Sequence, residues 1–249
     1  MGAPATKDAA QVVLDLSGIA RALDDYPALA RALTDPSAPA DAKTALVDNA
    51  FGTFGAEART VVKEALDKPW DSAKALQRWV EVSGVEQAWA WALANNSLRQ
   101  AIHEVFSFSQ IVAGDHELRK ALTNRRAPLD VRQSLASAVT ASMSSLAKAV
   151  VGVAVGSERG TIDDRIAQFI DLGVSKLGAK LAVARVASPM DEEQRTRLIA
   201  VLSAREGADI VLEDIVDPSV LGGVRVECGA DVIDSTMAAR LEAARRALG

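Results

Sequence analysis

The chain has 249 residues, of which 49% are hydrophobic and 24% are charged, and its formal net charge is −5. A chain of this size can bury one large hydrophobic core or two modest ones, so we expect a globular protein. Because the net charge is negative, basic residues form no long run and aromatic residues make up only 4% of the chain, we do not expect nucleic acid as a partner.

Cysteine content and hydropathy indicate the compartment. The single cysteine, Cys228, cannot form an intramolecular disulfide, which favours a reducing compartment such as the cytoplasm. The sequence has no run of 18 apolar residues that could span a bilayer, and its N-terminus lacks the basic segment and apolar core of a secretory signal. We therefore expect no direct insertion into a membrane.

The first two thirds of the sequence predict α-helices. Asp41 and Asp130 each follow a proline by two residues, an arrangement of turn and cap that begins a helix. Over residues 162–177, apolar side chains recur at steps of three and four, which predicts an amphipathic helix with one broad apolar stripe. The stripe consists of Ile162, Ile166, Phe169, Ile170, Val174 and Leu177.

Part of this helical region is repeated. When residues 29–46 are shifted by 89 positions onto residues 118–135, LARALTDPSAPADAKTAL lies over LRKALTNRRAPLDVRQSL without a gap, and eight of the eighteen positions are identical. Composition alone would give roughly one or two identities. Convergence of alanine-rich helices is the alternative, but the shared Ala-Pro-x-Asp turn favours an internal duplication of a helical unit.

A different pattern begins near Ala179. Residues 180–189, 208–218, 222–229 and 230–234 alternate like strands, and an acidic first turn and Gly207 bound a helix between the first two. Asp234 or Ser235 is expected to cap a last helix. We therefore predict a mainly α helical bundle with a smaller C-terminal α+β domain.

Catalytic and metal-binding motifs are not visible in the sequence. His103 and His116 are thirteen residues apart without a spaced set of further ligands, and Cys228 stands alone. Acidic pairs lie at helix starts, where the helix dipole already explains them. We therefore expect no catalytic residue, no cofactor and no metal site.

The C-terminal pattern also carries a family resemblance. Residues 210–229, IVLEDIVDPSVLGGVRVECG, resemble the C-terminal signature of the delta subunit of F-type ATP synthases, the bacterial counterpart of the oligomycin-sensitivity-conferring protein. The likeness lies in the alternating apolar residues, the Gly222-Gly223 pair and the strand that ends at Gly229. Residues 157–194 resemble the family's passage from the bundle into its first C-terminal strand, so the resemblance covers about residue 75 to the end.

The resemblance implies a non-catalytic stator subunit, peripheral on the cytoplasmic side of the plasma membrane. Such a subunit links the alpha subunits of the catalytic head to the peripheral-stalk b subunit, so that the head does not turn with the rotor during proton-driven ATP synthesis. It implies that residues 75–180 bind the head and residues 181–249 bind the stalk. Residues 1–74 exceed the usual family length and are expected to be an extra, partly duplicated helical segment. Longer forms, some fused to a b segment, are found in actinobacterial enzymes.

Within this division, contact residues for each partner can be predicted from apolar surface and from the place of turns and helix starts. In this family an amphipathic alpha-subunit helix lies in a groove between the first and fifth bundle helices, here about residues 84–98 and 162–178. The exposed apolar candidates in that groove are Trp89, Leu93, Ile166, Phe169, Ile170 and Gly173. The candidates for the b subunit are Asp217, Gly222, Gly223, Met237 and Leu241. Packing in the protein's own core is the competing interpretation for most of the apolar residues.

A second function class stays open at this point. The chain could instead be a small-molecule-binding regulatory or enzymatic α+β protein whose duplicated bundle forms a ligand pocket. Co-precipitation from membranes separates the two classes, because a stator brings ATP synthase subunits with it and a ligand-binding protein does not.

Overall fold

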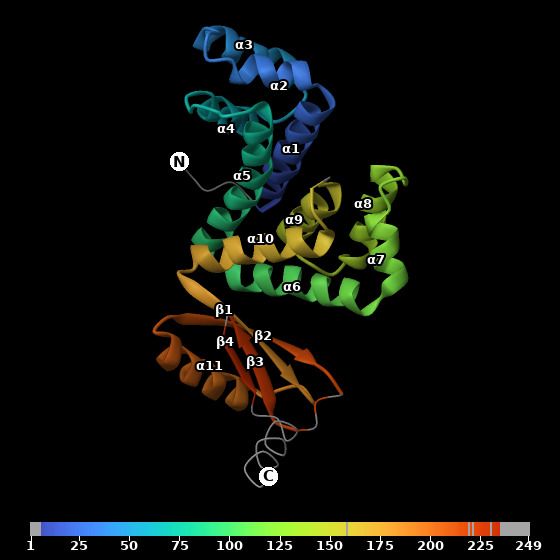
Figure 1. The fold of residues 1–249 in the computed structure, drawn as a ribbon, viewed down its shortest axis with the longest axis vertical. Coiled ribbons are helices and arrows are strands. Elements are labelled where there is room, and N and C mark those ends of the chain that lie inside the picture. Colours follow the sequence, from blue (N-terminus) through green and yellow to red (C-terminus); the bar gives the residue numbers. More distant parts are fainter. Residues whose placement is uncertain (1–5, 158, 219, 221, 230, 235–249) are drawn as a thin grey trace, which may run out of the picture. The chain divides into compact units, whose positions relative to one another are not determined.

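The structure, a computed structural model, describes residues 6–157, 159–218, 220, 222–229 and 231–234 (Figure 1). The chain divides into two compact units, which we call the helical unit, Met1–Phe169, and the C-terminal unit, Ile170–Gly249. The described residues form eleven helices and one four-stranded sheet, and the sheet lies in the C-terminal unit. The predicted fold class, a helical bundle with a smaller α+β part, is confirmed.

Ten helices precede the first strand, and the last of them runs from the helical unit into the C-terminal unit. Their bounds are α1 Thr6–Asp25, α2 Pro27–Thr34, α3 Ala40–Ala50, α4 Ala56–Leu66, α5 Ala73–Ala94, α6 Leu98–Gly114, α7 His116–Thr123, α8 Leu129–Val139, α9 Ser145–Gly156 and α10 Ile162–Lys176.

The predicted aspartate caps need a correction. α3 and α8 begin directly after Pro39 and Pro128, which occupy the N-cap positions, and no side chain caps either helix. Asp41 and Asp130 lie in the first turn, where a negative charge stabilises the positive end of the helix dipole. The proline fixes the backbone for the helix start, so each helix begins two residues earlier than the sequence pattern suggests.

The internal repeat extends well beyond the eighteen residues that reveal it in the sequence. Every bound of α2 and α3 reappears 89 residues later in α7 and α8. α4 and α9 begin at residues 56 and 145, and α5 and α10 begin at residues 73 and 162, again 89 residues apart. α1 and α6 end at residues 25 and 114. The helix bounds thus repeat over five helices in each copy, α1–α5 in the first and α6–α10 in the second, which is the pattern that an internal duplication predicts.

Local contacts repeat with the same spacing. In the loop after α2, the Asp35 carboxylate accepts a hydrogen bond from the backbone N–H of Ser37 at 2.8 Å. In the loop after α7, the Asn124 side chain accepts one from the backbone N–H of Arg126 at 3.1 Å. These side chains satisfy backbone donors in the turn, which is why Asp or Asn serves equally at this position.

The first copy is packed into the bundle through α1. This helix lies along both α5 and α9. At the crossing with α5, a Cβ atom on Gly84 would lie 3.3 Å from the Cβ atom of Leu16, so the glycine allows the two helices to approach closely. Residues 6–74 therefore share a compact unit with the helices that follow. Which part of the chain binds which subunit stays a prediction.

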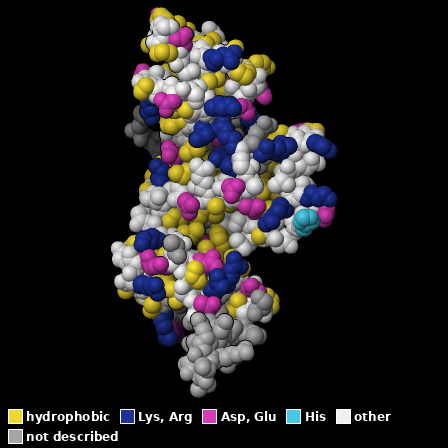
Figure 2. Space-filling view, in the orientation of Figure 1, with side chains coloured by type: hydrophobic (Ala, Val, Ile, Leu, Met, Phe, Trp, Pro, Cys, Tyr) yellow, Lys and Arg dark blue, Asp and Glu magenta, His cyan; other side chains and the backbone are white. Residues whose placement is uncertain are grey.

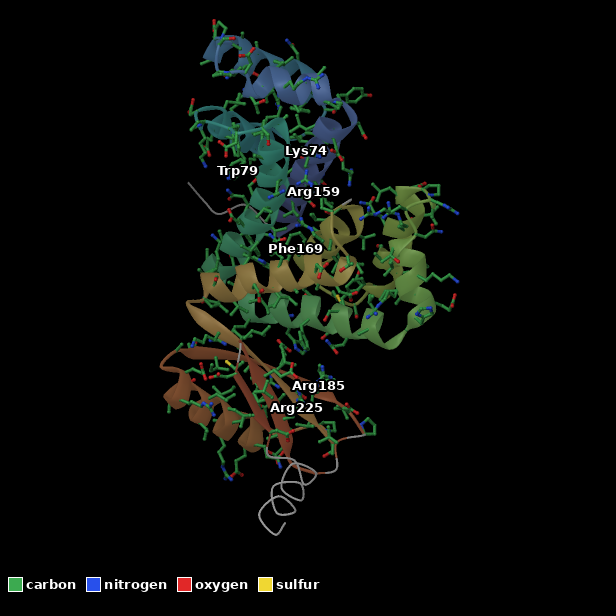
Figure 3. All side chains as sticks on the ribbon, viewed as in Figure 1. Lys74, Trp79, Arg159, Phe169, Arg185 and Arg225 are labelled. Atoms are coloured by element: carbon green, nitrogen blue, oxygen red, sulfur yellow. The ribbon has the colours of Figure 1, made fainter. Side chains whose placement is uncertain are left out.

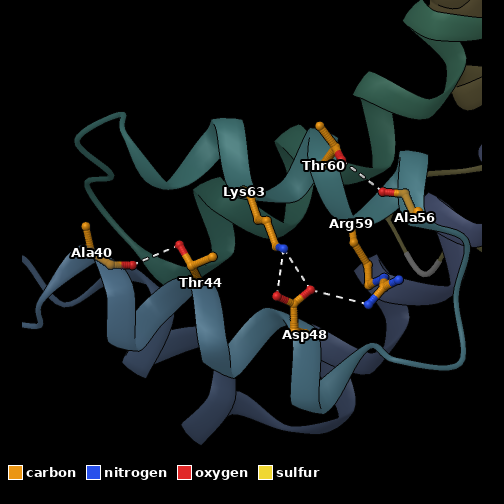
Figure 4. A network of polar contacts seen from close by, with 7 residues as sticks. All are labelled: Ala40, Thr44, Asp48, Ala56, Arg59, Thr60 and Lys63. Atoms are coloured by element: carbon orange, nitrogen blue, oxygen red, sulfur yellow. Dashed lines mark hydrogen bonds and ion pairs between the residues drawn. The ribbon is translucent and has the colours of Figure 1, made fainter.

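Polar surfaces differ between the copies. In the first copy, the Asp48 carboxylate lies 2.7 Å from Lys63 Nζ and 3.3 Å from Arg59 Nη1, which ties α3 to α4 (Figure 4). The hydrogen bond from Lys63 lowers the pKa of Asp48 below its usual value. The equivalent positions of the second copy hold Ser137, Lys148 and Gly152, so this ion network has no counterpart there.

The C-terminal unit contains a mixed sheet with one helix between its first two strands. In chain order its elements are β1 Ala179–Val186, α11 Glu192–Glu206, β2 Asp209–Val216, β3 Val224–Cys228 and β4 Asp231–Asp234. The strand order is β2-β1-β3-β4, with β1 parallel to β2 and the other pairs antiparallel. α11 ends at Gly207, whose φ of 62° is the left-handed value predicted for it.

One face of this sheet forms a core with α11. The core residues are Ala182, Ala184, Val186, Leu202, Ile210, Leu212, Val226 and Cys228. They alternate along β1 with half-buried residues, as the sequence pattern predicts. The four predicted strands and α11 are therefore confirmed, whereas the predicted last helix, residues 236–248, lies outside the described residues.

Candidate functional site

The two helices that the sequence assigns to the alpha-subunit groove do meet. Trp89 of α5 and Phe169 of α10 are both fully buried, with 0% of their surface exposed. The indole Nε1–H of Trp89 donates a hydrogen bond to the backbone oxygen of Phe169 at 2.8 Å. Phe169 lies along α10 in Figure 3. The contact satisfies the only polar atom of the tryptophan side chain, so Trp89 can be buried in the core without an unpaired donor.

The prediction that the alpha-groove candidates are exposed is wrong for most of them. Ile166 and Ile170 are also buried, as is Gly173, and only Leu93 is exposed, at 42%. The physical reason is that the apolar stripes of α5 and α10 are used within this protein, so their side chains are not on its surface. The idea that this helix pair takes part in alpha-subunit binding stays a prediction.

A buried ion cluster joins the same two helices, and sequence reasoning missed it. The Glu81 carboxylate of α5 lies 2.7 Å from Arg165 Nη2 of α10, and both residues are only 7% exposed. Arg159 Nη1 lies 3.6 Å from the same carboxylate, and the Arg165 guanidinium lies 4.7 Å from the centre of the Phe169 ring. The one available signal is the position of Arg165 beside the apolar stripe of its helix.

An apolar groove of about 260 Å³ remains on the helical unit. We call it the α5 groove, and its lining residues are Ala9, Val12, Glu57, Gln87, Ala90, Trp91 and Ala94. Four of these residues belong to the second half of α5, which lies within the segment assigned to alpha-subunit binding. The α5 groove is therefore an apolar surface that includes part of the predicted segment.

A larger groove, of about 520 Å³, lies in the C-terminal unit between α11 and the ends of β1 and β3. We call it the α11 groove. Two of its lining residues, Gly222 and Gly223, were predicted to contact the b subunit, and their φ values of 70° and 80° require glycine. The other lining residues are Val186, Ala187, Ser188, Met190, Gln194, Arg197, Leu198, Val201 and Val224.

The remaining b-subunit candidates lie elsewhere. The backbone N–H of Asp217 donates to the oxygen of Val186 at 2.8 Å, and the Asp217 oxygen accepts a bond from Val220 N–H at 3.0 Å. Asp217 thus shapes the turn before Gly222 and does not line the α11 groove. Met237 and Leu241 lie outside the described residues.

Metal binding, thiol chemistry and membrane insertion have little support in the part of the chain that the structure describes. In those residues, no group of three His, Cys, Asp or Glu side chains is placed to hold a metal ion. Cys228 is buried, and burial raises the pKa of its thiol, which makes a poor nucleophile. No helix among the described residues is long and apolar enough to cross a bilayer.

Comparison with known proteins identifies the family. The sequence model described as "ATP synthase delta (OSCP) subunit" matches residues 88–248. A protein of Frankia casuarinae named ATP synthase subunit delta is 34% identical, over 99% of this chain and 91% of its own length. Proteins with the same name from Renibacterium salmoninarum and a Nocardioides species are 32% and 36% identical, over 96% and 94% of this chain and 90% and 86% of their own lengths. The chain therefore belongs to the ATP synthase delta (OSCP) subunit family.

Proposed function

We propose that this chain joins the catalytic head of an F-type ATP synthase to its peripheral stalk, with a different unit binding each side. Membership of the delta family makes it a peripheral-stalk subunit of that complex. In our proposal the helical unit binds N-terminal helices of the alpha subunits, and the C-terminal unit binds the b subunit. The protein is then peripheral, on the cytoplasmic side of the membrane, and takes part in no catalytic step.

The observation that carries this proposal is that each compact unit presents its own apolar groove. A rotor that turns inside the head tends to carry the head with it, so the stator must hold both the head and the membrane anchor. One chain can do this only if it offers two separate binding surfaces. Exposed apolar surfaces mark partner sites, and helices commonly bind by placing an apolar face into a groove.

On the head side, the α5 groove suits an amphipathic helix. Its lining includes the small residues Ala9, Ala90 and Ala94 of α1 and α5, and Trp91 supplies an aromatic side chain. Aromatic side chains at the edge of a groove often dominate the binding energy. The buried contact between Trp89 and Phe169 and the ion pair between Glu81 and Arg165 then have a supporting role, because they fix α5 in place beneath the groove.

On the stalk side, the α11 groove offers exposed apolar surface. Val201 is 60% exposed although it lies on the wall of the groove, together with the half-buried Met190 and Leu198. An exposed valine beside two further apolar side chains gains from being covered. The long, helical form that the family gives the b subunit fits such a surface.

Two aspartate substitutions test the division of labour. Val201→Asp places a charge in the α11 groove, and Ala90→Asp places one in the α5 groove, where Ala90 is exposed. We expect Val201→Asp to weaken binding of a soluble b segment at least about tenfold and to leave alpha-peptide binding unchanged. Ala90→Asp should do the reverse. Isothermal titration calorimetry with each partner measures both.

The controls are exposed alanines outside both grooves. Ala200→Asp changes the residue next to Val201 on α11, and Ala113→Asp changes an exposed position on α6. Neither should alter binding of either partner. If Val201→Asp binds the b segment as tightly as Ala200→Asp does, the α11 groove is not the stalk site. If Ala90→Asp matches Ala113→Asp, the α5 groove is not the head site.

A further inference from the structure

A pocket rich in arginine lies in the second copy of the repeat, where α7, α8 and the start of α10 meet. It has a volume of about 380 Å³, and its wall includes Arg119, Arg125, Arg132, Thr123, Thr161 and Asp163. Lys and Arg side chains lie along this edge of the helical unit in Figure 2. Neither the family match nor the proposed stator contacts give this pocket a role.

Arg132 is the most unusual member of the wall. The residue is only 8% exposed, so its guanidinium is largely withdrawn from water. Its Nη1 donates to the backbone oxygen of Val155 at 2.9 Å, while its buried Nε has no hydrogen-bond partner in the structure. A cation that is largely withdrawn from water costs free energy, and an anion in the pocket would reduce that cost by compensating the charge.

The other two arginines differ in whether an acidic side chain lies beside them. Arg125 Nη2 donates to the backbone oxygen of Gly160 at 3.1 Å, which leaves its charge without a counter-ion in that contact. Arg119 Nη2 lies 3.6 Å from the Asp163 carboxylate, and its buried Nε has no partner. Asp163 is the acid in the wall, so the described wall carries three positive charges and one negative charge.

The start of α10 adds to the positive potential. The first turn of a helix presents backbone N–H groups and the positive end of the helix dipole, and it commonly binds anions. Asp164 opposes this effect in part, because its carboxylate accepts bonds from the backbone N–H of Thr161 at 3.2 Å and from the Thr161 hydroxyl at 2.7 Å. Thr161 caps the helix, since its hydroxyl accepts a bond from the backbone N–H of Asp164 at 3.1 Å, and Asp164 is outside the described wall of the pocket.

Comparison with the first copy shows that the repeat does not need these arginines to fold. The positions equivalent to Arg119, Arg125 and Arg132 hold Ala30, Pro36 and Lys43. The helix bounds around them are nevertheless the same, after the shift of 89 residues. Two of the three positive charges therefore belong to the second copy alone, although the helices around them have the same bounds in both copies.

We propose that this arginine pocket binds a phosphate group, either as inorganic phosphate or as part of a small phosphorylated molecule. Arginine holds phosphate oxygens with paired N–H groups, and the wall of the pocket contains three guanidinium groups. A phosphate with close to two negative charges matches the excess of two positive charges in the wall. The pocket volume accommodates a ligand of phosphate to nucleotide size.

Calorimetric titration of the full chain tests the proposal. Inorganic phosphate and ADP are titrated separately at constant ionic strength, with sodium chloride as the reference salt. We expect saturable binding of phosphate that Arg119→Ala and Arg132→Gln each weaken at least about tenfold. Arg119 is half-exposed, and its equivalent in the first copy is Ala30. Arg119→Ala is therefore expected to fold, and it still tests the proposal if Arg132→Gln disturbs folding.

Arg126→Ala is the matched control, because Arg126 is exposed, lies next to Arg125 and is not in the wall. It removes the same charge and should leave the dissociation constant unchanged. Tighter binding of ADP than of phosphate would identify a nucleotide site, and equal binding would identify a site for the phosphate group alone. The proposal is overturned if neither ligand binds saturably, or if Arg126→Ala weakens binding as much as Arg119→Ala does.

Discussion

Arg165→Met is expected to lower the free energy of unfolding by about 3–5 kcal/mol, because it leaves the Glu81 carboxylate buried without its closest cation. Glu81 is 7% exposed; its second ion-pair partner, Arg159, lies at 3.6 Å, beyond hydrogen-bond distance, and Arg21 acts on it through charge. Methionine keeps most of the side-chain volume, so the loss reports on charge more than on packing. Urea unfolding of the purified chain, followed by circular dichroism, measures the change.

A double variant separates the ion pair from general damage. Glu81→Gln combined with Arg165→Met should be less destabilised than Arg165→Met alone, because no uncompensated charge is then buried. The exposed pair of Glu193 and Arg197, at 2.7 Å, provides the comparison, and Arg197→Met should change the unfolding free energy by less than about 1 kcal/mol. Equal effects of Arg165→Met and Arg197→Met would contradict the assigned role of the buried cluster.

Trp89→Ala should have a similarly large effect, a loss of about 3–5 kcal/mol, because the side chain is fully buried and its removal leaves a cavity. Trp89→Phe should cost about 1–3 kcal/mol, since the ring is smaller and the oxygen of Phe169 loses its donor. Chemical denaturation provides the measurement.

Leu93→Ala, four residues further along the same helix, is the reference for Trp89. Leu93 is 42% exposed, so its truncation should cost much less than that of Trp89. A loss for Trp89→Ala no greater than that for Leu93→Ala would mean that α5 and α10 are not held together by this contact.

Local sequence patterns were sufficient to predict most of the elements. The 3.6-residue and two-residue periodicities identified α10, α11 and the four strands, because they depend only on which face of each element is apolar. The repeat was visible because the Ala-Pro-x-Asp turn keeps its chemistry in both copies. Only the structure showed its full extent, since helix bounds are preserved where most side chains have changed.

Contacts between distant residues could not be predicted in the same way. The apolar stripe of Ile166 and Phe169 shows that one face of α10 is covered, but it does not show whether a partner or α5 covers it. Glu81 and Arg165 are 84 positions apart, and no local pattern links them. The arginine pocket could have been suspected from the repeat, because Arg119 and Arg125 replace Ala30 and Pro36 within an otherwise similar segment.

The measurement that tests the central claim most directly is the composition of the complex formed by this chain with both partners. The full chain is mixed with an alpha N-terminal peptide and a soluble b segment, and native mass spectrometry measures which copies each complex contains. Separate binding surfaces predict a species with one copy of each, and an affinity for either partner that changes by less than about twofold when the other is bound. Competition between the peptide and the b segment, so that no species contains both, would contradict the account.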